Sequence, residues 1–331
     1  MTLDDFNQQF PDEKTCRHYL ERVIWPEGRS CPHCASQKSW PIISDTVRAG
    51  LYECAACSLQ FTVTTKTPLH STKLPLKTWL LALFCILNSS KGISSVYLAK
   101  WIGTTQKTAW RMGHAIRILM TMQIAKQLVL TGTVEVDETY VGGVPRPKTD
   151  VVRKRGRGTD KPCVLVMVSR EADARTVVVN KANYKEIAPQ VQKHVSPEAV
   201  LSTDEYKVYP KLGKKFAGHT TVNHSAGEYA RGSAHCNTAE SFNAMIERAR
   251  FGVFHHMSRL HLPKYLSEVV FRWNHRQPER EVVKKGRLKT IWEPMPVLTK
   301  IASLMKYAVG VQLRRQEDGG ILVLPVPLFG G

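Results

Sequence analysis

Two closely spaced pairs of cysteines constrain the N-terminal part of this 331-residue chain more than any other feature. Cys31-Pro32-His33-Cys34 and Cys54-Ala55-Ala56-Cys57 are separated by 19 residues. Each pair can sit on a tight turn, and four thiolates at this spacing can hold one Zn²⁺, which then replaces a hydrophobic core. The alternative is four unligated thiols. We predict a structural zinc ribbon within residues 1–70, ligated by Cys31, Cys34, Cys54 and Cys57, and leave out His33 and His70 because four thiolates complete a tetrahedron.

The segments around the cysteines fit this prediction. Residues 38–43, 50–53 and 59–63 have the composition and alternation of short ribbon strands. Residues 1–25 are expected to form a short helical lead-in.

The charge balance indicates a polyanionic partner. Lys and Arg total 47 against 28 Asp and Glu, which gives a formal net charge of +19 and a pI near 9.7. Nucleic acid is the first candidate, although charge alone leaves open a ribosome-like or merely soluble basic protein. No apolar run reaches the roughly 18 residues of a spanning helix, and no signal peptide is evident, so we expect no membrane association and a reducing, cytoplasmic compartment.

Residues 71–128 are predicted to be helical and to bind DNA. Helices are expected at 76–87, 94–102 and from about 106 to 122, with Gly103 in the turn before the last helix. Lys107 and Arg111 lie near the start of that helix. The pattern is typical of a helix-turn-helix, which presents its second helix to the major groove, although an ordinary helical hairpin has the same pattern.

Residues 129–280 have the pattern of a mixed α/β domain. Strands are expected at 133–140, 162–169, 174–179, 199–204 and 220–224, and helices at 184–194 and from Asn237 onwards. The basic loop from 146 to 161 contains Arg153, Lys154 and Arg155, which we expect to contact phosphate, unless the loop is only solvated. Residues 281–331 are expected to be a basic linker and a C-terminal tail.

Three carboxylates in this domain are candidates for a metal site. Asp137 and Asp204 lie on predicted strands, and Glu240, 35 residues after Asp204, opens a helix. Such residues can converge on two Mg²⁺ ions about 3.5–4 Å apart, which clamp the attacking and leaving oxygens of a phosphodiester. A strand-end Asp can also be an ordinary turn residue, and Glu240 can form a capping box with Asn237. Glu240 lies opposite the apolar stripe of its helix and is therefore not a core residue.

Five runs of sequence carry a resemblance to a known family: residues 134–143, 202–206, 235–243, 261–268 and 271–276. Together they resemble the zinc-ribbon, ISXO-like group of bacterial insertion-sequence transposases. The resemblance covers roughly residues 10 to 280. It implies a ribonuclease-H-like DDE catalytic domain with Asp137, Asp204 and Glu240 as its triad and Mg²⁺, or alternatively Mn²⁺, as cofactor. It also implies a bacterial, nucleoid-associated protein that pairs two DNA ends as a homodimer or higher oligomer.

The sequence departs from that family in two places. The family often has Lys or Arg seven residues after its third acid, whereas this chain has Glu247 there, followed by Arg248. We expect Arg248 and Arg250 to contact DNA from this helix. Some relatives use Asn for the third acid, so Asn237 stays an alternative metal ligand.

The resemblance implies a reaction as well as a fold. Mg²⁺ held by Asp137 and Asp204 would activate water to cut one strand at the element's end, and the resulting 3′-OH would attack target DNA. Glu240 would complete the environment of the second metal. Two rivals stay open: a ribonuclease-H-like nuclease that cuts without joining, and a non-catalytic DNA-binding regulator built on the zinc ribbon and the helix-turn-helix.

Overall fold

The computed structural model describes residues 1–142, 159–171, 173–222, 235–284, 287–315 and 321–325. The chain divides into two compact units, a first unit of Met1–Ala125 with Glu293–Gly331 and a second unit of Lys126–Trp292. This division differs from the four consecutive segments that we expected. The reason is that the chain returns to the first unit after completing the second.

The zinc ribbon is a small antiparallel sheet of three strands, as predicted. Its order is β1-β2-β3, and the strands are Ser39–Pro41, Tyr52–Cys54 and Gln60–Phe61. Two helices precede it, α1 (Leu3–Gln9) and α2 (Glu13–Ile24). Trp25, Tyr52 and Phe61 pack together beside the cysteines, so the apolar core of the ribbon consists of only a few side chains.

The helical part of the first unit contains the three expected helices, α3 (Leu76–Asn88), α4 (Ser95–Ile102) and α5 (Gln106–Ala125). Ser94 caps α4, and Gly103 ends it with a φ of 65°, a left-handed conformation that favours glycine. Helix α5 is buried over most of its length after Ala109, because it packs against α3, α4 and a further helix, α10. Its exposed residues are Gln106 and Lys107 in the first turn and Thr121 and Ala125 near its end.

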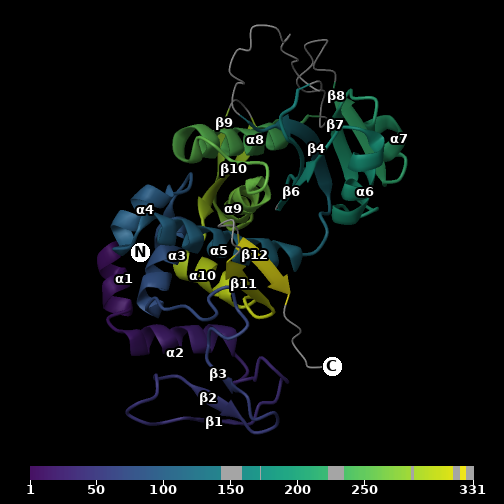
Figure 1. Cartoon of the computed structure of the whole chain (residues 1–331). Coiled ribbons are helices and arrows are strands. Elements are labelled where there is room, and N and C mark those ends of the chain that lie inside the picture. Colours follow the sequence, from purple (N-terminus) through teal and green to yellow (C-terminus); the bar gives the residue numbers. More distant parts are fainter. Residues whose placement is uncertain (143–158, 172, 223–234, 285–286, 316–320, 326–331) are drawn as a thin grey trace, which may run out of the picture. The chain divides into compact units, whose positions relative to one another are not determined.

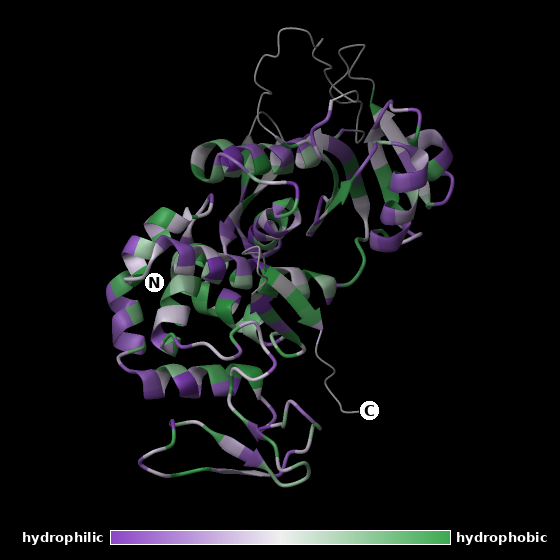
Figure 2. Cartoon of the chain, in the orientation of Figure 1, coloured by the Kyte–Doolittle hydropathy of each residue, from purple (hydrophilic) through white to green (hydrophobic). Residues whose placement is uncertain are grey.

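The C-terminal part is not a simple tail, contrary to expectation. Residues Val297–Met305 form helix α10, whose apolar stripe of Val297, Ile301 and Leu304 is buried, and the helix packs on α2, α3 and α5 within the first unit. A hairpin follows, β11 (Val311–Arg315) paired with β12 (Ile321–Pro325), and the apolar β12 is green in Figure 2. The i, i+4, i+7 spacing of the stripe is the signal that could have predicted α10.

The second unit is built on a five-stranded mixed sheet, which confirms the predicted α/β class. The strand order is β6-β5-β4-β7-β8 (Figure 1). The strands are β4 (Thr133–Tyr140), β5 (Cys163–Ser169), β6 (Ala174–Val179), β7 (Val200–Asp204) and β8 (Gly218–Val222). β4, β5 and β6 pair antiparallel, whereas β4, β7 and β8 run parallel.

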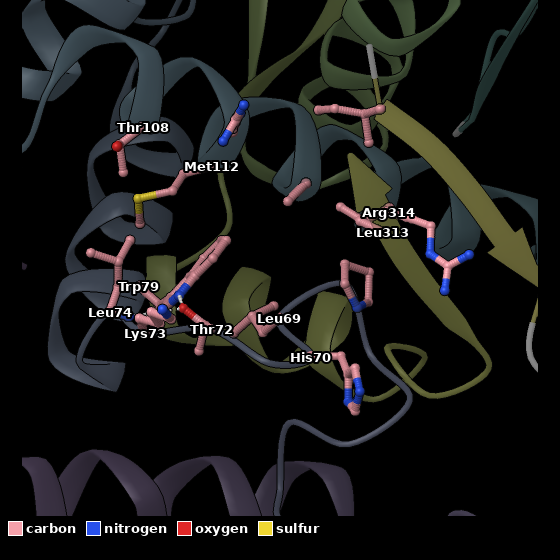
Figure 3. A pocket seen from close by; sticks show the side chains of 14 residues that line it. Leu69, His70, Thr72, Lys73, Leu74, Trp79, Thr108, Met112, Leu313 and Arg314 are labelled. Atoms are coloured by element: carbon pink, nitrogen blue, oxygen red, sulfur yellow. Dashed lines mark hydrogen bonds between the residues drawn. The ribbon is translucent and has the colours of Figure 1, made fainter. Parts of the chain in front are cut away.

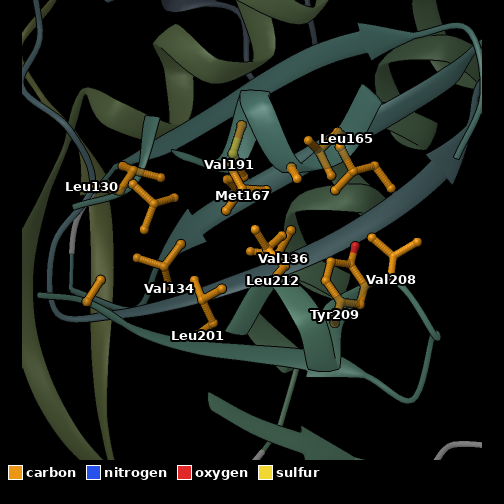
Figure 4. Close-up of a cluster of buried hydrophobic side chains, with 14 residues drawn as sticks. Leu130, Val134, Val136, Leu165, Met167, Val191, Leu201, Val208, Tyr209 and Leu212 are labelled. Carbon is orange, nitrogen blue, oxygen red and sulfur yellow. The ribbon is translucent and has the colours of Figure 1, made fainter. Parts of the chain in front are cut away.

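Helices cover both faces of this sheet. On one face, α6 (Tyr184–His194) and α7 (Tyr209–Gly213) close a cluster that includes Val134 and Val136 of β4 (Figure 4). On the other, α8 (Asn237–Ala249) packs on β4 and β5, and α9 (Leu262–Asn274) packs on β6. Every residue of β5 is consequently buried.

Short elements complete the second unit. A π-helical turn, Arg250–Phe254, follows α8. After α9, β9 (Arg276–Lys284) pairs with β10 (Arg287–Pro294). Among the residues that the structure describes, no helix combines the length and hydropathy needed to cross a bilayer.

Candidate active site and zinc centre

The four predicted cysteines converge on one point. Their sulfur atoms all lie within 4.8 Å of one another. The Sγ atoms of Cys31 and Cys57 are 3.8 Å apart, and those of Cys34 and Cys54 are 3.5 Å apart. A tetrahedral zinc site with Zn–S bonds of about 2.3 Å needs S···S separations of roughly 3.8 Å. The residues therefore fit a structural Zn²⁺, and neither His33 nor His70 belongs to the group.

The backbone of the second knuckle favours a thiolate. Burial acts to raise the pKa of Cys54, but the N–H groups of Cys57 and Ala56, followed by the thiols of Cys34 and Cys31, oppose it and lower that pKa to about 6. The amide of Ala56 lies 3.4 Å from the sulfur of Cys54. Since zinc binds thiolates, this hydrogen bonding prepares the knuckle for the metal.

The first two carboxylates of the predicted triad lie on neighbouring parallel strands. β4 pairs with β7 in a register that places Val136 opposite Thr203. The next residue on each strand is Asp137 and Asp204, so the two side chains leave the sheet side by side on the same face. Because Val136 points to the α6 and α7 face, both aspartates point to the face that α8 covers.

The environment of Asp137 is unusual for a carboxylate. Burial raises its pKa to about 6, the N–H of Glu138 and the amide of Asn243 oppose that rise, and the negative charges of Asp204 and Glu240 add to it. The other two members of the predicted triad therefore both act electrostatically on Asp137. Such crowding of anions is relieved when a cation binds.

The third carboxylate, Glu240, lies in the first turn of α8 and is exposed. It does not complete a closed cage with the two aspartates. In the described ranges, the four cysteines form the one group of three or more metal-ligating residues whose ligand atoms all lie within 4.8 Å. Asp137 and Asp204 are thus positioned by the sheet and Glu240 by the helix, but the ligand atoms of the three carboxylates do not all lie within 4.8 Å of one another.

The alternative explanation of Glu240, a capping box with Asn237, does not hold at the start of α8. The N-cap residue is Cys236, and no side chain of the helix itself caps the first turn. Instead Glu135, which the sequence analysis did not single out, accepts hydrogen bonds from the amides of Thr238 at 2.7 Å and Ala239 at 2.9 Å. Glu135 lies two residues before Asp137 on β4, and this period of two could have indicated that both face α8.

A second residue that sequence reasoning missed is Asn243. Its Nδ2 donates a 2.8 Å hydrogen bond to Oδ2 of Asp137. Its Oδ1 is buried and has no hydrogen-bond partner within the described part of the chain. Asn243 follows Glu240 by three residues, so both lie on one side of α8, and this spacing was the available signal.

The DNA-binding candidates in the first unit differ in accessibility. Lys107 is exposed in the first turn of α5. Arg111, one turn further on, lines a cavity of about 310 Å³. The hairpin residues Leu313 and Arg314 line the same cavity (Figure 3). The Nη2 atom of Arg111 is buried there without a hydrogen-bond partner among the described residues. Lys107 is therefore the better placed of the two for contact with a DNA backbone.

The candidates in the second unit divide in the same way. Arg248 is exposed at the end of α8. Arg250 is buried, and its guanidinium binds Glu247 with an Nη2–Oε2 distance of 2.7 Å. Glu247 stands where the resemblance leads us to expect a basic residue. It pairs with Arg250, one of the residues predicted to contact DNA. Arg153, Lys154 and Arg155 lie outside the described residues.

Comparisons with known proteins match two parts of the chain to transposase domains. Residues 129–274 match the family model of the ISXO2-like transposase domain, and residues 11–60 match that of the transposase zinc-ribbon domain. An uncharacterized protein in the transposable element ISH50 of Halobacterium salinarum is 28% identical over 305 residues, 86% of this chain and 97% of that protein. A match to the crystal structure of the Mos1 strand transfer complex covers 58% of this chain and 75% of that chain, with 11% identity and a TM-score of 0.22.

Proposed function

Because this chain belongs to the ISXO2-like transposases of insertion sequences, with their zinc-ribbon domain at its N-terminal side, we propose that it cuts the ends of its element and joins them to target DNA. The reaction would be DDE catalysis by Asp137, Asp204 and Glu240. The five-stranded mixed sheet with helices on both faces is compatible with a ribonuclease-H-like domain, and that assignment stays part of the proposal.

One observation carries this proposal. Asp137 and Asp204 occupy adjacent positions on parallel strands, and the charges of Asp204 and Glu240 both raise the pKa of Asp137. A protein that only binds DNA gains nothing by burying one carboxylate beside two others, since anions repel phosphate. The cluster is therefore better explained by a divalent cation between protein and substrate than by the regulator hypothesis.

The donor set fits Mg²⁺, and Mn²⁺ as its substitute, because all three groups offer hard carboxylate oxygens. When bound, the metal supplies activation of the attacking oxygen and neutralisation of the phosphate charge. Asp137 and Asp204 would hold it from the sheet, and Glu240 would do so from α8. Asn237 at the start of α8 is exposed and stays an alternative ligand.

The remaining functional groups of the chain would serve DNA. The amide of Asn243 donates to Oδ2 of Asp137, and the backbone amide of Glu138 donates to Oδ1. The remaining acceptor positions of the carboxylate would bind the metal. Lys107 and Arg248 are exposed cations for the phosphate backbone. The zinc ribbon and α5 would recognise the element's ends. A homodimer or higher oligomer would hold two ends together.

The test is an in-vitro assay on zinc-loaded protein with Mg²⁺ and DNA from the element's end. Wild-type protein is expected to cut the end and join it to target DNA. Asp204→Asn is expected to abolish both steps while binding the end with unchanged affinity. Cleavage without joining would favour the nuclease hypothesis, and end binding with no cleavage in the wild type would favour the regulator. Cleavage that survives Asp204→Asn would contradict the catalytic assignment.

A further inference from the structure

Helix α8 has no cap of its own, although it carries Glu240 in its first turn. We propose that Glu135 is a positioning residue: its buried carboxylate fixes the start of α8 to strand β4, and so sets Glu240 relative to Asp137. This inference rests on the proposed function, because it assigns Glu135 to the same metal site.

The contacts of Glu135 with α8 are direct and numerous. Oε2 accepts the amides of Thr238 and Ala239 at 2.7 and 2.9 Å, and Oε1 accepts the Thr238 hydroxyl at 3.1 Å. The Glu135 side chain is 0% exposed. Amides of a first helical turn have no partner inside the helix, and a carboxylate there also interacts favourably with the helix dipole. The residue after Ala239 is Glu240, so the residues held by Glu135 directly precede the third carboxylate.

A second set of contacts fixes His235, the residue before the N-cap of α8. Arg170 donates to Oε1 of Glu135 at 2.7 Å and to the carbonyl of His235 at 2.8 Å. Ser202 of β7 donates to the same carbonyl at 2.8 Å. The Nδ1 atom of His235 lies 3.1 Å from Oε1 of Glu135. Strands β4 and β7, which carry the two aspartates, are thereby both tied to the start of α8.

This arrangement explains why a strand residue rather than a local cap holds the helix. A serine or aspartate at the N-cap would satisfy the amides of α8 but would leave the helix free to shift along the sheet. Glu135 satisfies the same amides from the strand that presents Asp137 two residues later. Since metal sites depend on ligands held in place by surrounding hydrogen bonds, loss of the hydrogen bonds from α8 to Glu135 should weaken metal binding.

The decisive variant is Glu135→Gln, which keeps the size of the side chain but offers one acceptor oxygen instead of two. The affinity of the zinc-loaded, DNA-free protein for Mn²⁺ is measured by titration calorimetry. We expect it to fall by about 10-fold to 100-fold, the range typical of lost outer contacts at metal sites. Hydrogen exchange of the Thr238 and Ala239 amides is expected to accelerate, while binding of the element's end stays unchanged.

The matched control is Asn183→Ala, which removes a helix cap from the same unit at a distance from the carboxylates. Asn183 caps α6 through its bond to the Glu186 amide at 3.0 Å, on the opposite face of the sheet. If Glu135 only stabilises the fold, both variants should affect Mn²⁺ affinity equally, and that result would overturn the inference. We expect the Asn183 variant to retain wild-type affinity.

Thr238→Val provides a second, milder variant in case Glu135→Gln does not fold. It removes the hydroxyl that donates to Glu135 and keeps both backbone bonds, and we expect Mn²⁺ affinity to fall in the same direction. If Mn²⁺ affinity is unchanged in a folded Glu135→Gln protein, the positioning role is refuted and the proposed function is not affected. If Glu135→Gln does not fold, unchanged affinity in Thr238→Val has the same meaning. Wild-type protein that binds no Mn²⁺ would overturn both this inference and the metal site of the proposed function.

Discussion

Replacing Asp137 by asparagine is expected to abolish catalysis and, without Mg²⁺, to make the protein more stable. The carboxylate is largely withdrawn from water, and its pKa is raised from an ordinary 3.8 to about 6, first by burial and further by the charges of Asp204 and Glu240. At neutral pH the folded protein therefore holds an unfavourable negative charge that the unfolded chain exposes to solvent.

The magnitude follows from the two pKa values. Each unit of difference corresponds to about 1.4 kcal/mol, so the ionised Asp137 lowers the free energy of unfolding by roughly 3 kcal/mol at neutral pH. Asparagine has one acceptor oxygen, whereas Asp137 accepts from both the Glu138 amide and Asn243. Losing one of these bonds costs about 1 kcal/mol. The net gain is about 2 kcal/mol, or a rise in Tm of roughly 4–8 °C for a unit of this size.

The gain must depend on pH with a definite sign. A carboxyl whose folded pKa lies above its unfolded value takes up a proton on folding between the two, so the wild type loses stability as the pH rises from about 4 to about 6. Asp137→Asn lacks this loss. Its advantage should therefore be absent below about pH 4 and complete above about pH 7.

Thermal unfolding of zinc-loaded protein without Mg²⁺, at about pH 4 and about pH 8, measures this difference. The matched control is Glu279→Gln, which neutralises a half-exposed carboxylate of β9 in the same unit and is expected to change Tm little at either pH. If Asp137→Asn is no more stable than the wild type at the higher pH, the ionised Asp137 does not lower the free energy of unfolding. That result would refute the proposed destabilisation of the metal-free protein by this carboxylate.

Three further variants test other parts of the site. Asn243→Ala removes a hydrogen bond that stabilises the ionised Asp137, so the pKa of Asp137 should rise above about 6 and the acid limb of the cleavage–pH curve should move to higher pH. Cys54→Ser, like zinc chelation, should unfold the ribbon seen by circular dichroism and weaken end binding. Lys107→Ala should weaken DNA binding similarly for all sequences and reduce the slope of log affinity against log salt by about one, as measured by fluorescence anisotropy.

Much of the secondary structure could be predicted because hydrophobic periodicity is a local property. The bounds of β4 and of α6 agree with those expected, and the cysteine spacing predicted the sulfur cluster. Helix α10 was missed, although its apolar stripe was present, because the surrounding Gly- and Pro-containing segments suggested a tail.

The partners of charged side chains could not be predicted, because they depend on which surfaces long-range packing brings together. Arg250 was expected to bind DNA, yet it is buried against Glu247. Arg111 was expected on an exposed recognition helix, but most of α5 lies in the core of its unit and Arg111 lines a cavity. The spacing of residues along the chain predicts neither the burial of Arg250 nor the position of Arg111.

The same distinction applies to the carboxylates. The order and spacing of Asp137, Asp204 and Glu240 along the chain identified them as candidates. Only the parallel pairing of β4 with β7 placed the two aspartates side by side. Only the packing of α8 on β4 brought the Thr238 and Ala239 amides within hydrogen-bonding distance of Glu135. A sequence records which groups a chain carries, whereas burial and hydrogen bonding between distant segments decide their charge, their orientation and their neighbours.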